Sequence, residues 1–586
     1  MKYLLVAINA KYIHSNPAVY SLKAYAGKEL ENFIELAEYT INQQVQDILA
    51  DIYRKKPTVI GFSCYIWNWN MIRELLPEIS KVLPDTDIWL GGPEVTYDAE
   101  KILEKHSNLT GIFVGEGEAT FRELVQCYVD MEEKQLQKNR QELFFNISGL
   151  CLPTGYTKPR TLTDITEIPF LYNDLAPFEN KIIYYESSRG CPYHCSYCLS
   201  SIDKKVRLRN IDVVKKELQF FLDHNVKQVK FVDRTFNCNH RHAMEIWKYI
   251  YENDNGVTNF HFEISADILN EEEIALLNQF RPGLAQLEIG VQSTNEKTIR
   301  EINRVMNVER LEKIVEAIRN GKNIHQHLDL IAGLPYEDFE SFKKSFNRVY
   351  AMKPDQLQLG FLKVLKGSEM EERAGEFGIC YAERPPYEVL YTKWISYDDI
   401  LVLKKVEEMV EVYYNSNQYT HVLPFLERIF ETPFDMFLEL AKYYDSKGYF
   451  IKSPARTDRY NVLLDFAKTH DASHIDIYKE LLTFDLYLRE NMKTRPDFCA
   501  DLKDETYRKF AGAFYKQEEN SRKYLPAYTD YSWKQLWKMT HLEPFYYPVW
   551  DVEKLSKKDC SKMPKCKYTC KWLSISCQAF HVSLNR

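Results

Sequence analysis

Six short apolar segments recur between residues 183 and 365, separated by intervals long enough to hold helices. The segments are "IYYESS", "VKFVD", "FHFEIS", "AQLEIGVQ", "HLDLIAG" and "QLQLGFLKVL". Intervals such as "IDVVKKELQFFLDH" and "ERLEKIVEAIRNG" repeat apolar residues at helical spacing. Strands that alternate with helices predict a parallel sheet, because each helix returns the chain to begin the next strand in the same direction. We therefore expect a partial (βα)6 barrel at residues 181–375, with its chemistry at the carboxyl ends of the strands.

A similar alternation occupies residues 1–130, which places the chain in the α/β class. Strand candidates are "YLLVAIN", "TVIGFSCY", "DIWLGG" and "GIFVGEG", and "NMIRELLPEISKVL" is among the amphipathic segments between them. This pattern predicts a doubly wound domain, Rossmann-like or flavodoxin-like, with a ligand crevice beyond the carboxyl ends of its strands. Residues 131–180 begin with a polar run and continue rich in Pro, Thr and Gly, which indicates a connector.

The remainder, residues 376–586, is expected to form a mostly helical C-terminal domain. Its periodic segments include "FDMFLELAKYYDSK" and "HIDIYKELLTFDLYLREN", and its many Tyr and Phe residues suit helix packing better than a binding stripe. No apolar run approaches the roughly 20 residues of a membrane helix, and the N-terminus lacks the long apolar centre of a signal peptide. We therefore expect a cytoplasmic protein without a membrane partner. The net charge of -8 also argues against a general nucleic-acid-binding surface.

Three cysteines, Cys191, Cys195 and Cys198, follow the first strand of the predicted barrel within "CPYHCSYC". Structural zinc sites are usually completed by a fourth protein ligand, and no second Cys-x-x-Cys pair follows nearby. An iron–sulfur cubane held by three cysteines leaves one iron free to bind a substrate or cofactor. A zinc knuckle or three unrelated thiols remain the alternatives.

This spacing, with Tyr197 just before the last cysteine and on a six-unit βα region, resembles the radical S-adenosylmethionine (SAM) superfamily. The resemblance implies that the cysteines hold a [4Fe–4S] cluster whose open iron binds SAM, which is cleaved reductively to a 5′-deoxyadenosyl radical. It further implies that Tyr197 lies against the adenine. The residues that it assigns to SAM binding at later strand ends are Glu263, Gln292, Arg304 and Gly333.

One motif departs from the superfamily pattern. The stretch "FVDRTFNCNHRH" lies where members usually carry glycines that contact the methionine part of SAM, and it has no glycine. We expect Asp233, or its neighbours Arg234, Thr235 and Asn237, to substitute. Each of these assigned side chains has an ordinary alternative as a polar residue at a strand end or on a helix face.

The N-terminal segments "GFSCYIWN", "WLGGPEVT" and "FVGEGEATF" resemble the cobalamin-binding domain that precedes the barrel in one radical SAM subclass. The resemblance implies that Ser63, Gly91 and Gly92 line the slot for the nucleotide tail of cobalamin. The usual Asp-x-His-x-x-Gly motif is degenerate here, because only His14 remains of it. His14 is thus a candidate cobalt ligand or an ordinary loop residue, and the domain itself could be a relict that binds nothing.

Four further cysteines, Cys560, Cys566, Cys570 and Cys577, lie in the Lys-rich tail. They suggest zinc or an auxiliary cluster, or simply a flexible end.

The resemblance implies a cobalamin-dependent radical SAM enzyme, and we expect methyl transfer to an unactivated carbon of an unknown small-molecule or RNA substrate. The expected partners include an electron donor such as flavodoxin or ferredoxin. The alternatives are a radical rearrangement, tRNA methylthiolation, and a non-catalytic cobalamin or redox sensor. No catalytic residue that touches the substrate is predicted.

Overall fold

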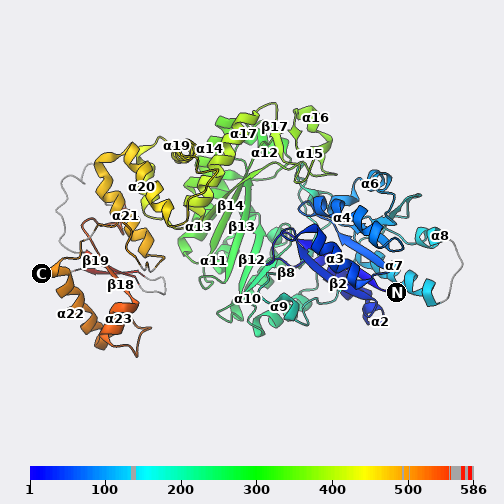
Figure 1. Cartoon of the computed structure of the whole chain (residues 1–586), viewed down its shortest axis with the longest axis horizontal. Coiled ribbons are helices and arrows are strands. Elements are labelled where there is room, and N and C mark those ends of the chain that lie inside the picture. Colours follow the sequence, from blue (N-terminus) through cyan, green and yellow to red (C-terminus); the bar gives the residue numbers. More distant parts are fainter. Residues whose placement is uncertain are drawn as a thin grey trace. The chain divides into compact units, whose positions relative to one another are not determined.

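The computed structural model describes residues 1–133, 140–490, 492, 494–500, 502–552, 555, 569–573 and 579–583. The chain divides into two compact units (Figure 1). The first unit contains residues 1–345 and 359–400, and the second contains residues 346–358 and the chain from 401 onward. The predicted cofactor site residues all lie in the first unit, so its two sheets are described first.

The N-terminal sheet has a parallel core of five strands, which confirms the predicted doubly wound α/β domain. They run in the order β2-β1-β3-β4-β5, and their bounds are β1 Tyr3–Asn9, β2 Ile34–Thr40, β3 Val59–Ser63, β4 Asp87–Gly91 and β5 Gly111–Phe113. The sequence pattern did not indicate β2, an edge strand whose "IELAEYT" alternates only loosely between buried and half-buried positions. Its partner β1 is buried throughout, as its continuous apolar run requires.

Helices cover both faces of this sheet. Leu4, Val6 and Ile8 of β1 pack into one apolar cluster, which includes residues of α3 Val45–Lys55 and α4 Trp69–Val82. The alternate residues Tyr3, Leu5 and Ala7 pack into a second cluster, with α1 Pro17–Ala26 and α7 Glu118–Glu133. Successive side chains of a strand point to opposite faces of the sheet, so the single apolar run of β1 contributes to two cores.

The segment predicted to be only a connector contributes two strands to the same sheet. β6 Leu150–Leu152 pairs antiparallel with β5, and β7 Gly155–Tyr156 pairs antiparallel with β6. Two of the residues that indicated a connector, Pro153 and Gly155, instead belong to the tight turn of this hairpin, where Gly155 has a φ of 117°. All three residues of β6 are buried, so the sheet extends well beyond residue 130.

The second sheet is the predicted partial barrel. Its order is β15-β14-β13-β12-β11-β8, so each strand lies beside its neighbour in sequence and the sheet stays open between β8 and β15. The pairs from β8 to β14 are parallel. The strands are β8 Ile183–Tyr185, β11 Gln228–Phe231, β12 Asn259–Ile264, β13 Ala285–Gln292, β14 His325–Ala332 and β15 Gln356–Phe361. The crossover helices include α9 Ile211–Asp223, α10 His240–Glu252 and α13 Val308–Gly321.

The two faces of the barrel sheet differ in character. Buried apolar residues such as Phe262, Leu287 and Leu328 alternate along the strands with polar ones. The apolar set packs beneath the helices, as βα crossovers require. The polar set is therefore left on the inner face of the partial barrel, where apolar residues are usual. It comprises Lys230, His261, Glu263, Glu288, His327 and Asp329.

The second unit is mostly helical, as predicted. Its main helices are α19 Pro433–Ser446, α20 Asp458–His470, α21 Ile475–Tyr487 and α22 Glu505–Ser521. It also has an unpredicted antiparallel sheet of β18 His541–Phe545, β19 Thr569–Leu573 and β20 Ala579–Ser583. Of the tail cysteines, Cys570 lies in β19, while Cys560, Cys566 and Cys577 lie outside the described residues. None of the helices described combines the length and apolar character that spanning a bilayer requires.

A buried ion pair fastens the segment before the barrel to its first helix. The guanidinium of Arg209 donates to both carboxylate oxygens of Glu217 on α9, at 2.7 and 3.0 Å, and to the carbonyl oxygens of Ile165 and Ile168. Both charged side chains are only 7% exposed. Tyr185 of β8 donates a further hydrogen bond to Glu217 at 2.6 Å.

We predict that Arg209→Met lowers the free energy of unfolding by about 3–5 kcal/mol, because it leaves the buried Glu217 carboxylate without its cation. Urea denaturation followed by tryptophan fluorescence measures the change. Arg300→Met is the control, because Arg300 and Glu296 form an ion pair in which both side chains are more than 80% exposed, and it should cost less than about 1 kcal/mol. Equal losses of unfolding free energy in the two variants would contradict a special contribution of the buried Arg209–Glu217 ion pair to stability.

Candidate functional site

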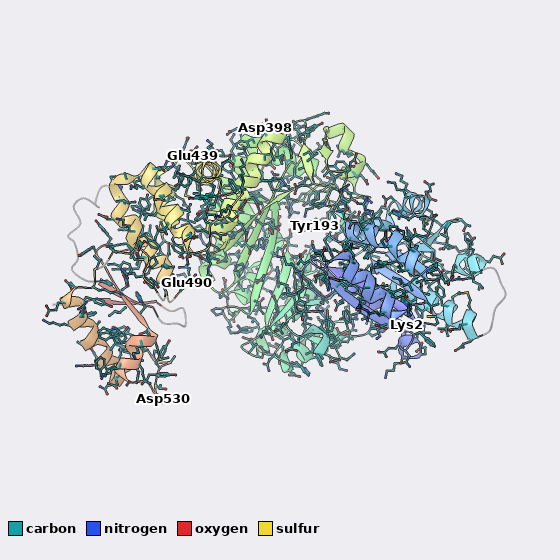
Figure 2. The ribbon with its side chains drawn as sticks, in the orientation of Figure 1. Lys2, Tyr193, Asp398, Glu439, Glu490 and Asp530 are labelled. Atoms are coloured by element: carbon teal, nitrogen blue, oxygen red, sulfur yellow. The ribbon has the colours of Figure 1, made fainter. Side chains whose placement is uncertain are left out.

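The three predicted cluster cysteines line one cavity in the first unit. Cys191, Cys195 and Cys198 lie in the loop after the short strand β9 Ser188–Arg189, and all three face a cavity with about 820 Å³ of empty space, part of it open to solvent. Tyr193, labelled in Figure 2, belongs to the same loop and lines the same cavity. The sequence spacing therefore corresponds to a shared pocket.

Backbone contacts hold this loop in place. Gly190 has a φ of 96°, and a Cβ there would lie 2.5 Å from the carbonyl oxygen of Lys205, so only glycine fits. The amide of Cys191 donates to the carbonyl of Asp203 at 3.1 Å. The amide of Cys198 donates to the carbonyl of Cys195 at 3.1 Å, which closes a turn between those two cysteines.

The three thiols line the same cavity, but they are not gathered around a single point. Among the residues that the structure describes, no three His, Cys, Asp or Glu side chains are gathered to hold a metal ion. Cys191 Sγ is instead 3.5 Å from the hydroxyl of Thr235, and burial raises the pKa of Cys195. Metal binding requires the deprotonation of thiols.

Three of the residues assigned to SAM lie across the same cavity. Glu263, Gln292 and Arg304 line it together with the cysteines and Tyr197. Gln292 has a φ of 69°, which is uncommon for a residue other than glycine, and the register of β13 with β14 shifts between Gly290 and Gln292. Strained backbone of this kind concentrates at functional sites, where the surrounding fold maintains it.

Arg304 joins the two walls of the cavity. Its Nη1 lies 3.3 Å from the Tyr197 hydroxyl and 3.9 Å from Cys195 Sγ, and its Nη2 donates to the carbonyl of Gly290. Its Nε is buried and has no hydrogen-bond partner. A guanidinium beside a thiol favours the thiolate, and here it counteracts the increase in the pKa of Cys195 that burial causes.

Asp233 does not occupy the position predicted for it. Its carboxylate is fully buried outside the cavity and accepts hydrogen bonds from the Ser187 amide at 3.0 Å and from the hydroxyls of Ser187 and Ser188 at 2.6 and 2.5 Å. Burial raises the pKa of Asp233 to about 7. Asp233 thus supports the backbone that leads to the cysteine loop, and its neighbours Arg234 and Thr235 line the cavity instead.

Two other predicted residues also lie apart from the cavities. Gly333 has a φ of 88°, and a Cβ there would meet Val389 at 2.7 Å, so packing accounts for its glycine. His14 lines none of the cavities described here, and its Nδ1 is 2.5 Å from the hydroxyl of Tyr184 on β8. His14 therefore links the N-terminal domain to the barrel in this structure.

The polar inner face of the barrel contributes residues that the sequence motifs did not indicate. Glu288 and Asp329 line the cysteine cavity, and Lys230 Nζ and His261 Nε2 each lie 2.9 Å from the Glu288 carboxylate. Burial alone would raise the pKa of Glu288, but the hydrogen bond from His261 and the charge of Lys230 lower it to about 2. His327 Nε2 lies 3.0 Å from Asp329. These residues could have been recognised in the sequence because charged or polar residues alternate with apolar residues within buried strands, as in "HLDLIAG".

A second cavity lies at the carboxyl edge of the N-terminal sheet. It contains about 800 Å³ of empty space, and Ser63, Gly91 and Gly92 all line it. Gly92 has a φ of 116°, and a Cβ there would clash with the carbonyl oxygen of Cys64. The remaining wall is largely aromatic and glycine-rich. Such a surface accepts a bulky, mostly apolar ligand in close contact with the backbone.

A third cavity, of about 750 Å³, adjoins the second and reaches the barrel. It is lined from the N-terminal side by α1 and from the barrel by β8 residues that include Tyr184. Four residues line both cavities, namely Ala18, Tyr65, Glu118 and Arg189. The two spaces therefore meet where the N-terminal domain faces the barrel.

Comparison with protein families matches three parts of the chain. Residues 3–125 match the B12 binding domain, residues 185–349 match the radical SAM superfamily, and residues 375–565 match a family described only as a protein of unknown function. The chain joins a cobalamin-binding domain to a radical SAM domain and a C-terminal domain of unknown function. The cofactors implied by these domains are a [4Fe–4S] cluster, SAM and cobalamin.

The chain is similar to the cobalamin-dependent radical SAM methyltransferase TokK of Streptomyces tokunonensis, with 24% identity over 56% of this chain and 51% of that protein. It therefore spans about half the length of that relative. It is also 24% identical to the uncharacterized methyltransferase PH0819 of Pyrococcus horikoshii, over 56% of this chain and 72% of that one. The cobalamin-dependent SAM radical enzyme OxsB, solved with aqua-cobalamin bound, shares the fold with a TM-score of 0.57, 14% identity and coverage of 82% of this chain and 79% of that one.

The residues present fit the cofactors of both domains. In the radical SAM domain, three thiols and an unsatisfied buried guanidinium nitrogen face one space, which suits iron together with a ligand that carries a carboxylate. In the cobalamin-binding domain, the slot beside Gly92 accepts no side chain, and its aromatic walls suit a large ring system.

A buried glutamate supports the strained segment of the radical SAM domain. Glu337 is 1% exposed, and its Oε1 accepts hydrogen bonds from Ser293, next to Gln292, and from Ser345, at 2.8 and 2.9 Å. Its Oε2 is buried without a hydrogen-bond partner. Burial raises the pKa of Glu337 to about 7, above the ordinary value of 4.5.

We predict that the stability of the native protein falls relative to that of Glu337→Gln as the pH rises from about 4.5 to 7. Over this range the folded protein keeps the Glu337 proton while the unfolded chain releases it, so the difference grows to about 3 kcal/mol. Urea denaturation of both proteins at several pH values measures it, and the subtraction removes the titration of other groups. Parallel stability profiles would show that Glu337 does not hold the proton.

Proposed function

We propose that this protein is a cobalamin-dependent radical SAM enzyme that transfers a methyl group to an unactivated carbon of a polar substrate. The supporting observation is that one compact unit contains both a cysteine-lined cavity and a glycine-lined cavity, each with most of the residues that the family resemblance implies. When bound, the cluster with SAM supplies a radical able to abstract hydrogen from carbon, and methylcobalamin supplies a methyl group.

In the radical SAM domain, Cys191, Cys195 and Cys198 would bind three irons and leave the fourth for SAM. Arg304 would donate to the SAM carboxylate through the Nε that lacks a partner. The carboxylate of Glu263 and the amide of Gln292 would bind polar groups of SAM from the opposite wall, and Tyr197 would lie against its adenine.

In the cobalamin-binding domain, Ser63, Gly91 and Gly92 would surround the nucleotide tail, with the Ser63 hydroxyl as a hydrogen-bonding group. The adjoining cavity would hold the corrin ring against the barrel and exclude water from it. We do not assign His14 as a cobalt ligand, because it lines neither of the two cavities proposed to hold cobalamin.

The inner face of the barrel supports a polar substrate. Burying Lys, His, Glu and Asp side chains on this face costs free energy, whereas burying apolar side chains there would not. A role in binding a ligand would account for keeping these charged and polar groups at such a position. Glu288 and Asp329 present acceptor oxygens to the cavity, so we expect the substrate to carry hydrogen-bond donors near its reacting carbon. An electron donor such as flavodoxin or ferredoxin would reduce the cluster, and a reducing cytoplasm would keep the thiols free.

The contacts of the other cysteines argue against tRNA methylthiolation, which in related proteins uses a second cysteine set in the N-terminal domain. Cys64 and Cys151 are buried in the apolar cluster on one face of the sheet, and Cys127 packs against the cluster on the other face. These thiols do not share a site. A sensor without catalysis would not need the SAM cavity, whereas a radical rearrangement would use the same two cavities and is separated from methylation by product analysis.

Two variants test the two cofactor sites independently. Cys198→Ala should lower the iron content and reduce 5′-deoxyadenosine formation at least tenfold after anaerobic reconstitution, while hydroxocobalamin is retained through gel filtration. Ala18→Phe places a ring where the second and third cavities meet, so it should weaken hydroxocobalamin retention at least tenfold and leave the iron content unchanged. Mass spectrometry of the products with labelled SAM identifies methyl transfer.

The control for Ala18→Phe is Ala24→Phe, which lies on the same helix but lines neither cavity, and it should retain hydroxocobalamin. Failure of the native protein to retain hydroxocobalamin would refute the cobalamin assignment. If the protein holds an intact cluster but does not form 5′-deoxyadenosine, a non-catalytic sensor would be the better-supported function.

A further inference from the structure

Two glutamates of the cobalamin-binding domain lie in the segment that closes the glycine-lined cavity. Glu116 and Glu118 follow β5 and alternate with Gly115 and Gly117, and all four residues line that cavity. Gly115 has a φ of 82°, and a Cβ there would meet no atom within 4 Å. A ligand in the cavity would therefore contact the backbone from which both carboxylates extend.

Both carboxylates bind the residue that leads into the cysteine loop. Arg189 Nη1 lies 3.2 Å from Glu116, and its Nη2 lies 2.9 Å from Glu118. Arg189 ends β9, and only Gly190 separates it from Cys191. The ion pairs thus join the cavity wall to the upstream end of the cysteine loop.

Glu116 also holds the downstream end of the same loop. Arg207, in β10 Arg207–Leu208, pairs through Nη2 with Glu116 and with Asp203, both at 2.6 Å. The carbonyl of Asp203 accepts the hydrogen bond from the Cys191 amide. β9 and β10 are themselves paired antiparallel, with Arg207 opposite Arg189. One N-terminal carboxylate therefore contacts both ends of the segment that carries all three cysteines.

These ion pairs are shielded from solvent. The side chains of Glu116, Glu118 and Arg207 are 15%, 8% and 11% exposed, and that of Arg189 is 22% exposed. The hydrogen bond from Arg207 and the charge of Arg189 outweigh burial and lower the pKa of Glu116 to about 2. Partly buried charges attract more strongly than exposed ones, so a displacement of Glu116 is transmitted to both arginines.

We propose that Glu116 is a positioning residue through which occupancy of the glycine-lined cavity sets the position of the cysteine loop. The inference rests on the proposed function in that cobalamin is the occupant. Coupling between binding sites is reciprocal, so a loop held by the cluster would in turn change the affinity for cobalamin by the same factor.

The test measures the cysteine loop directly, in protein without a cluster. Cys191, Cys195 and Cys198 are alkylated with iodoacetamide, with and without saturating cyanocobalamin, and the rates are followed by mass spectrometry. Cyanocobalamin is the probe because its cyanide ligand keeps the cobalt from reacting with thiols. In the native protein we expect cyanocobalamin to change the alkylation rates by about fivefold or more.

Glu116→Gln, measured at a cyanocobalamin concentration that saturates this variant, should show no change in alkylation rates, and Glu116→Asp should recover part of the response. The control is Lys181→Gln, which removes the ion pair of Lys181 with Glu38 at 2.8 Å. That pair also joins the N-terminal domain to the segment before β8 but does not touch the cysteine loop, so this variant should respond like the native protein. If Glu116→Gln does not fold, Arg207→Lys takes its place and should weaken the response.

The outcomes are distinct. Native protein that retains cyanocobalamin with unchanged alkylation rates would overturn the coupling and leave the proposed function intact, as would a full response in Glu116→Gln. Native protein that does not retain cyanocobalamin would overturn both.

Discussion

The arrangement of both candidate cofactor sites depends on one geometric constraint, that the carboxyl ends of neighbouring parallel strands meet along a single edge of a sheet. In the N-terminal sheet this edge brings Ser63, Gly91 and Gly115 from three strands to one cavity. In the barrel it brings Glu263 and Gln292 to the loop that carries the cysteines. Apolar packing against the helices maintains the sheets, while the residues at their edges are free to differ in chemistry.

The second organising factor is the pairing of buried charge. A charged group in a poorly solvated position is tolerated when an opposite charge and hydrogen bonds compensate it. Glu288 has Lys230 and His261, Glu217 has Arg209, and Glu116 has two arginines. The first of these groups lies where SAM or a substrate would bind, whereas the other two join segments that are distant in sequence. All three glutamates line cavities, so neither burial nor a position beside a cavity separates ligand-binding charges from structural ones.

Local patterns were sufficient to predict most elements and a large part of the sites. All six barrel strands were indicated by apolar runs, and the family resemblance that the cysteine spacing indicated assigned Tyr197, Glu263, Gln292 and Arg304 to one site, and all four line one cavity. The family resemblance placed Ser63, Gly91 and Gly92 in another.

The failures share a cause, which is that partners distant in sequence decide the role of a polar residue. Asp233 was assigned to the cavity rim, but the hydroxyls of Ser187 and Ser188 bind it inside the protein. The hairpin β6–β7 was assigned to a connector because its burial depends on pairing with β5. The role of Glu116 was not visible, because its arginines lie more than 70 positions away in the chain.

The path of the backbone between the two compact units limits how the protein can be dissected. Residues 346–358 belong to the second unit although residues on both sides of them belong to the first. The chain therefore passes between the units three times, and no single cut releases either one whole. A fragment that ends near residue 375 would retain a piece of the C-terminal unit without its packing partners. The C-terminal unit is thus not a single continuous segment that follows a finished barrel.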